Sequence, residues 1–86
     1  MKIRKRDYGS ANVVGKNIEE LRKARGISQR EFIAKIQVMG CDINPTSYSK
    51  LEGQVRIATD KEIFVISKIL NVPMEKLFDG VELDGE

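Results

Sequence analysis

The chain has 86 residues, enough for one small domain with a modest core but too few for a second domain or a large substrate cleft. Hydrophobic residues make up 41% of it and charged residues 33%, with only two prolines, a composition that excludes a disordered protein and indicates a globular one. The net charge of +2 is uninformative as a total, because the charges are unevenly distributed along the chain.

The N-terminal arm, residues 1–12, carries four basic side chains: Lys2, Arg4, Lys5 and Arg6. Such an arm suits a polyanion, and we weigh contact with DNA evenly against a solvated tail. It lacks the apolar stretch of a signal peptide, so we expect it to stay in the mature protein.

The first helix is predicted over about 13–25, with Asn12 as N-cap and Gly26 after its end. An apolar stripe recurs at helical spacing along it, with Arg22 beside the stripe: Val14, Ile18, Leu21 and Ala24. The opposite face is expected to lie in water: Lys16, Glu19, Glu20 and Lys23.

A second helix is predicted over about 28–39, because Ser28 and Glu31 have the spacing of a capping box. Its apolar positions are Phe32, Ile33, Ile36 and Met39, and Gly40 ends it. Ile43 is expected to anchor the following connector to the core.

The third helix, 45–52, has Asn44 as N-cap, Pro45 as first residue and Gly53 after its end. Tyr48 and Leu51 are predicted to point inward. The other positions are predicted to face solvent and are short or cationic: Pro45, Thr46, Ser47, Ser49 and Lys50.

This outward face favours DNA binding. Small side chains let the helix backbone approach a groove, and hydroxyls can bond to phosphate oxygens or base edges. Within 45–52 no acidic residue precedes Glu52 to repel DNA. The plainer interpretation is an ordinary solvated helix face.

Thr59 and Glu62 form another capping box before a fourth helix, 60–70, and a short last helix, 74–78, follows Pro73. No strand-like alternation appears, so the prediction is an all-α, compact five-helix domain over 13–79. Residues 80–86 form an acidic tail, which we interpret as a solubilising end.

Several site types are not predicted. Cys41 is the single cysteine, the chain has no histidine, and we find no clustered metal ligands and no Walker-type phosphate loop. We therefore expect no catalytic site, no metal and no cofactor. The absence of a disulfide and of a long apolar run predicts a cytoplasmic protein without a membrane partner. A small-molecule effector is left open.

From Val14 to Phe78 the chain resembles the Cro and phage-repressor (Xre-type) family of helix-turn-helix regulators. The segments that carry the resemblance are NIEELRKARGISQ, YSKLE with Gly53 after it, and ILNVPMEKLF. The stretch from Ser28 to Glu52 is longer than the commonest family pattern and is similar to the longer-turn subset. The resemblance implies a lambda-repressor-like fold.

The resemblance also implies residue roles. Gln29 matches a glutamine that contacts phosphate and braces the recognition helix, and Arg30 lies beside it. Thr46, Ser47 and Lys50 match positions that face bases in the major groove. Pro45 matches a position often used in the same way, and we also expect Ser49 to contact DNA. Gln54 and Arg56 match a loop that follows phosphates, and Arg22 with Glu52 matches a structural salt bridge. Ile33 replaces a usual alanine, which implies an altered angle between helices two and three.

The leading hypothesis is a sequence-specific transcriptional regulator, a repressor, that binds double-stranded DNA as a homodimer. Its candidate dimer surface is apolar: Met74, Leu77, Phe78, Val81 and Leu83. The alternative is a protein-interaction module on the same scaffold, such as an antitoxin-type or regulatory partner subunit. An enzyme is the least favoured class.

Overall fold

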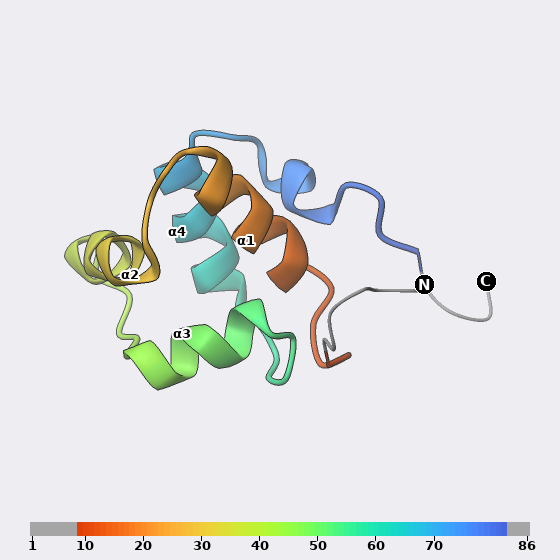
Figure 1. The fold of residues 1–86 in the computed structure, drawn as a ribbon, viewed down its shortest axis with the longest axis horizontal. Helices are drawn as coiled ribbons and strands as arrows, with labels where there is room; N and C mark the ends of the chain where they lie inside the picture. The colour runs from red at the N-terminus through yellow and green to blue at the C-terminus, as the bar shows by residue number, and fades with distance from the viewer. Residues whose placement is uncertain (1–8, 83–86) are drawn as a thin grey trace.

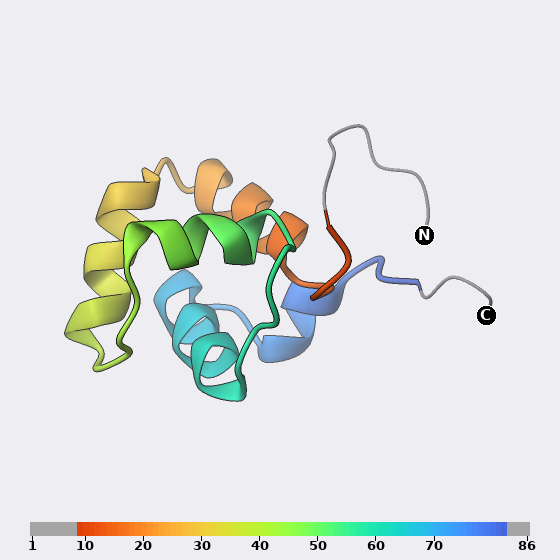
Figure 2. The same cartoon turned by 90° about the horizontal axis from the view of Figure 1, so that it is seen from below.

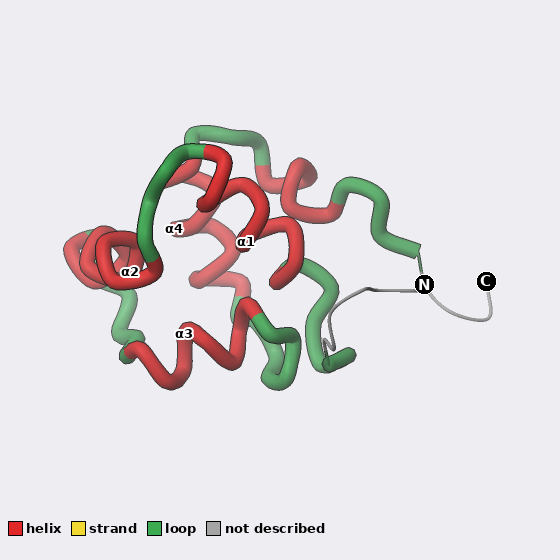
Figure 3. Tube along the Cα trace, in the orientation of Figure 1, coloured by secondary structure: helices red, strands yellow, loops and turns green. Residues whose placement is uncertain are grey.

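The computed structural model describes residues 9–82, and this part of the chain contains helices and no strand (Figures 1 and 3). The elements are α1 (Gly15–Ala24), α2 (Gln29–Val38), α3 (Pro45–Glu52), α4 (Asp60–Leu70) and the 3₁₀ helix η1 (Met74–Phe78). The all-α prediction is confirmed. The expected fifth helix is instead a 3₁₀ helix, with bonds between residues three apart such as Lys76 N–H to Pro73 O.

The ends of α3 and α4 lie where the sequence predicts them, because the capping groups are local. Asn44 Oδ1 accepts from Ser47 N–H at 2.8 Å. Thr59 Oγ1 accepts from Glu62 N–H at 3.1 Å, and Glu62 returns the bond to Thr59 N–H at 3.0 Å, so the predicted capping box is complete.

The start of α1 differs from the prediction. The helix begins at Gly15, although Asn12 Oδ1 does accept from the N–H groups of Val14 at 3.0 Å and Gly15 at 2.8 Å. Asn12 therefore caps a turn that leads into α1. The next helix, α2, begins after Ser28, whose hydroxyl accepts from Glu31 N–H at 3.1 Å.

A single core lies between the helices. In Figure 1, α1 and α4 lie side by side, α2 is seen end-on and α3 runs along the lower edge; Figure 2 looks onto α3 and shows it steeply inclined to α2. Phe32 of α2 and Tyr48 of α3 meet edge to face, with ring centroids 5.7 Å apart. The core residues are Val14, Ile18, Phe32, Ile33, Ile36, Cys41, Ile43, Tyr48, Leu51, Val65, Ile66, Leu70 and Leu77.

Three predicted orientations were wrong. Ala24 was placed on the apolar stripe of the first helix but is exposed. Glu19 was expected to face water but is only 7% exposed, and its carboxylate lies 3.2 Å from the Lys23 ammonium. Met39 was placed on the apolar face of helix two but follows the last residue of α2 and is 46% exposed. Within residues 9–82 no helix combines the length and the apolar character needed to cross a bilayer.

Candidate nucleic-acid interface

The outward face of α3 is small and cationic. Pro45, Thr46, Ser49 and Lys50 are exposed, Ser47 is half-buried, and Tyr48 and Leu51 are fully buried. Glu52, the acidic residue of α3, is only 2% exposed. An open hollow on this face is lined by Pro45, Thr46, Ser49, Lys50 and Val55. A negatively charged ligand would therefore meet no exposed carboxylate on α3.

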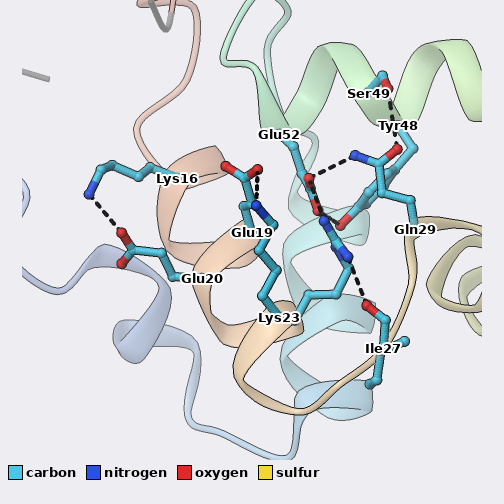
Figure 4. Close-up of polar contacts among 10 residues, drawn as sticks. Lys16, Glu19, Glu20, Lys23, Ile27, Gln29, Tyr48, Ser49 and Glu52 are labelled. Atoms are coloured by element: carbon cyan, nitrogen blue, oxygen red, sulfur yellow. Dashed lines mark hydrogen bonds and ion pairs between the residues drawn. The ribbon is translucent and has the colours of Figure 1, made fainter. Parts of the chain in front are cut away.

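Glu52 joins three helices (Figure 4). Its carboxylate accepts from Arg22 of α1, at 2.7 Å from Nε and 3.2 Å from Nη2, and from Gln29 Nε2 of α2 at 2.9 Å. The Tyr48 hydroxyl of α3 also donates to it. Because the acceptor and its donors are buried or half-buried together, these bonds set the orientation of α3 relative to α1 and α2.

The protonation states in this cluster support its bonding. The hydrogen bond to Glu52 raises the pKa of Arg22, so the guanidinium stays charged. Burial raises the pKa of Tyr48, and the Glu52 carboxylate raises it further. The phenol therefore remains a hydrogen-bond donor at neutral pH.

Gln29, the first residue of α2, is hydrogen-bonded to two residues of α3. Its Nε2 donates to Glu52, and its Oε1 accepts from the Ser49 hydroxyl at 3.4 Å (Figure 4). Arg30 follows it and is exposed. The structure thus brings the first residue of α2 directly against the outward side of α3.

Gln54 and Arg56, which were predicted to follow phosphates, are both held by hydrogen bonds within the domain. Gln54 is 1% exposed and its amide donates to the Asn12 carbonyl, so its side chain is not accessible to a phosphate. Arg56 Nε donates to Ser47 O at 2.9 Å, and Nη1 donates to Ile57 O at 2.8 Å. The remaining Arg56 bonds go to both oxygens of Glu62, at 2.9 and 2.8 Å. Both residues stabilise the loop after α3.

The electrostatics of the loop follow from the Arg56–Glu62 pair. Burial of the Glu62 carboxylate opposes its ionisation, but the hydrogen bonds from Arg56 and from Thr59 outweigh burial. The pKa of Glu62 is therefore lowered from its ordinary value of 4.5. The carboxylate is ionised at neutral pH and the ion pair is complete.

A short N-terminal segment, residues 9–12, also docks on this loop. Gly9 N–H donates to Gly53 O and Ala11 N–H to Gln54 O, each at 2.9 Å. Asn12 Nδ2 donates to Leu51 O at 3.0 Å and to Arg56 O at 2.8 Å. Residues 9–12, predicted as part of the arm, are thus bonded to the domain. Sequence reasoning missed these bonds because their partners lie about 40 residues away.

The sequence matches a known protein family over most of its length. A family model described as helix-turn-helix matches residues 18–77, which include α1 from Ile18 onward and the whole of α2, α3 and α4. The chain belongs to the Xre-type (Cro and phage-repressor) helix-turn-helix family. Comparison with curated proteins and with solved structures gave no significant match. The Xre-type family is one of DNA-binding regulatory domains, not of enzymes.

In this Xre-type domain the turn between α2 and α3 is a well-bonded connector. Gly40 has φ of 92°, a left-handed conformation that glycine adopts without strain. Gln37 Nε2 donates to Ile43 O at 2.8 Å. Cys41 and Ile43 are buried, and burial raises the pKa of the Cys41 thiol. The Xre-type turn is therefore anchored by its own apolar residues.

Some predicted residues of the Xre-type chain lie outside the described residues: Lys2, Arg4, Lys5, Arg6 and Leu83. Of the other predicted dimer residues, Leu77 is fully buried in the core and cannot line a dimer surface in this fold. Its backbone carbonyl accepts from Asn17 Nδ2 at 2.8 Å, which ties η1 to α1. Met74 and Phe78 stay 45% and 40% exposed.

Proposed function

We propose that this protein is a sequence-specific transcriptional repressor that binds double-stranded DNA with α3 in the major groove. The observation that carries the proposal is the outward face of α3. It exposes small side chains and the Lys50 ammonium, while Glu52 is turned into the core. Such a face can approach base edges closely without charge repulsion.

The proposed contacts follow from the positions of the side chains. Thr46, Ser47 and Lys50 face base edges, and Pro45 packs against the same groove wall. Gln29 and Ser49 are hydrogen-bonded where the start of α2 meets α3, Arg30 follows Gln29 and is exposed, and all three contact phosphates. Gln54 and Arg56 support the surface from the loop and do not belong to the contacting set.

We further propose that the domain acts as a homodimer. A two-fold dimer presents one α3 to each of two successive major grooves, roughly 34 Å apart along the duplex. Met74 and Phe78, which stay exposed on η1, and the half-buried Val81 are the candidate dimer residues among those that the structure describes. Occupancy of such an operator blocks transcription initiation where the site overlaps a promoter.

Selection of bound sequences from a random DNA pool tests this function. A repressor of this kind enriches a palindromic sequence, since two identical subunits read two identical half-sites. An enriched sequence without symmetry would refute the dimer but keep the DNA reader. If no sequence is enriched over random DNA, the protein-interaction module is the better description.

A further inference from the structure

Val55 is an exposed apolar residue that the predicted contact set does not contain. Its side chain is 58% exposed, although it lies in the loop directly after α3. The Val55 N–H donates to Lys50 O at 3.0 Å, which holds the residue at the end of the helix. One Cγ of Val55 lies near Gly9 of the docked N-terminal segment, and the rest of the side chain is open to solvent.

The position of Val55 gives it a surface role. It lines the open hollow on the outward face of α3, together with Pro45, Thr46, Ser49 and Lys50. The apolar groups of this lining are the proline ring, the threonine and valine methyls and the lysine stem. One charge is present, the Lys50 ammonium. The hollow therefore suits a small apolar group on an anionic polymer.

One group in the major groove has this chemistry. Each base pair presents donors and acceptors there, and thymine alone among the four bases also presents a methyl group, at C5. Contact between that methyl and an apolar side chain distinguishes T·A from the other pairs. The hydroxyls of Thr46 and Ser47 do not provide this discrimination, because a hydroxyl bonds to several bases.

We infer that the hollow is a thymine-reading subsite, in which Val55 contacts the C5-methyl of one thymine in each half-site. Lys50, on the same lining, binds a neighbouring phosphate or base acceptor and fixes the register. This inference rests on the proposed DNA-binding function and assigns it a specificity residue. It makes Val55, in the loop after the recognition helix, part of the sequence readout.

The test replaces each thymine of the selected operator in turn with deoxyuridine, which removes the methyl and changes nothing else in the base. Binding of the wild-type protein is measured by fluorescence anisotropy. At one thymine per half-site, affinity should fall about fourfold, and about fifteenfold when both half-sites are changed, as expected for loss of a buried methyl. Replacement of other thymines should have smaller effects.

Two variants assign the effect to Val55. Val55→Ala should bind the thymine operator more weakly and should lose its sensitivity to deoxyuridine at that position. Ile57→Ala is the matched control, because Ile57 is 68% exposed in the same loop but does not line the hollow. It should keep the full sensitivity. Thermal unfolding followed by circular dichroism verifies that both variants fold.

The outcomes separate this inference from the proposed function. If an operator is enriched but no deoxyuridine replacement weakens binding, the thymine subsite is refuted and the DNA reader stands. The same holds if Val55→Ala keeps the sensitivity of the wild-type protein. If the random pool yields no enriched sequence, the proposed function fails and the subsite fails with it.

Discussion

The guanidinium of Arg56 and the carboxylate of Glu62 face each other across the loop between α3 and α4, with N–O distances of 2.9 and 2.8 Å. The same guanidinium bonds to Ser47 O on α3, and the same carboxylate caps α4 through Thr59 N–H. One ion pair therefore connects α3 with the start of α4. The loop that carries Val55 depends on it.

Replacing Glu62 with Gln should destabilise the protein by about 1–2 kcal/mol at neutral pH, because it leaves Arg56 without its carboxylate. The pKa of Glu62 is lower in the folded chain than its ordinary value of 4.5. The ion pair therefore contributes fully above that pH and its contribution falls as pH drops through the folded-state value. Urea unfolding of wild type and variant at several pH values measures the difference, which should shrink in acid. A difference that grows in acid would contradict the assignment.

The Asn12 side chain is expected to stabilise the fold in two ways, because its Oδ1 caps the turn before α1 and its Nδ2 donates to the loop after α3. In Asn12→Asp the oxygen that accepts from Val14 and Gly15 is retained, but both donations from Nδ2 are lost and a carboxylate faces the Leu51 and Arg56 carbonyls. We expect a loss of about 1–3 kcal/mol in the free energy of unfolding. Amide shifts in an NMR spectrum should move at residues 51–56 and at Val14 and Gly15, and much less in the rest of α1. Equal stability of variant and wild type would show that these bonds are dispensable.

Tyr48→Phe should remove one bond of the Glu52 cluster while keeping the edge-to-face contact with Phe32. Glu52 keeps its bonds to Arg22 and Gln29, so the expected loss of stability is about 1–2 kcal/mol and not a loss of the fold. Chemical denaturation gives the loss. Wild-type stability of this variant would mean that the hydroxyl bond contributes no net free energy.

Lys50→Ala should weaken operator binding by about 1–3 kcal/mol if the ammonium reads a base. If it binds a phosphate, affinity should fall for all sequences and the slope of log affinity against log salt should decrease by about one. Lys68→Ala is the control, since Lys68 is an exposed lysine on α4 whose ammonium lies over the Phe64 ring. Unchanged affinity and unchanged sequence preference of Lys50→Ala would remove the central residue of the proposed interface.

The basic arm offers a separate test. Replacing Arg4, Lys5 and Arg6 with Ala should weaken binding to all DNA sequences alike and flatten the salt dependence, because phosphate contacts release counterions without reading bases. Gel-shift titrations at several salt concentrations compare the variant with the wild type. A salt slope equal to that of the wild type would identify the arm as a solvated tail.

The parts of the fold that could be predicted are those specified by neighbouring residues. Asn44 with Pro45, and Thr59 with Glu62, are complete capping signals within three residues, so the limits of α3 and α4 agree with the structure. The start of α1 was misplaced because Asn12 caps a turn before the helix. The last element has too few residues for a period to distinguish an α-helix from a 3₁₀ helix.

The internal bonds of two candidate site residues could not be predicted from local patterns. Gln54 and Arg56 match positions that face phosphates in relatives, but here they bond to residues distant in sequence or in the next helix. Polar residues in a loop are expected at the surface, and no local pattern shows that Gln54 is buried. Val55 was missed because an isolated exposed apolar residue is common and carries no signal by itself.

The docking of residues 9–12 has a consequence for the order of folding. Three of its bonds join residues 39, 42 and 44 positions apart, so each encloses most of α1, α2 and α3 in a closed loop. During synthesis Asn12 is made about 40 residues before its partners in the loop after α3. The bonds that hold the C-terminal end of α3 to residues 9–12 can therefore form only after all three helices have been made, and a shorter nascent chain lacks them.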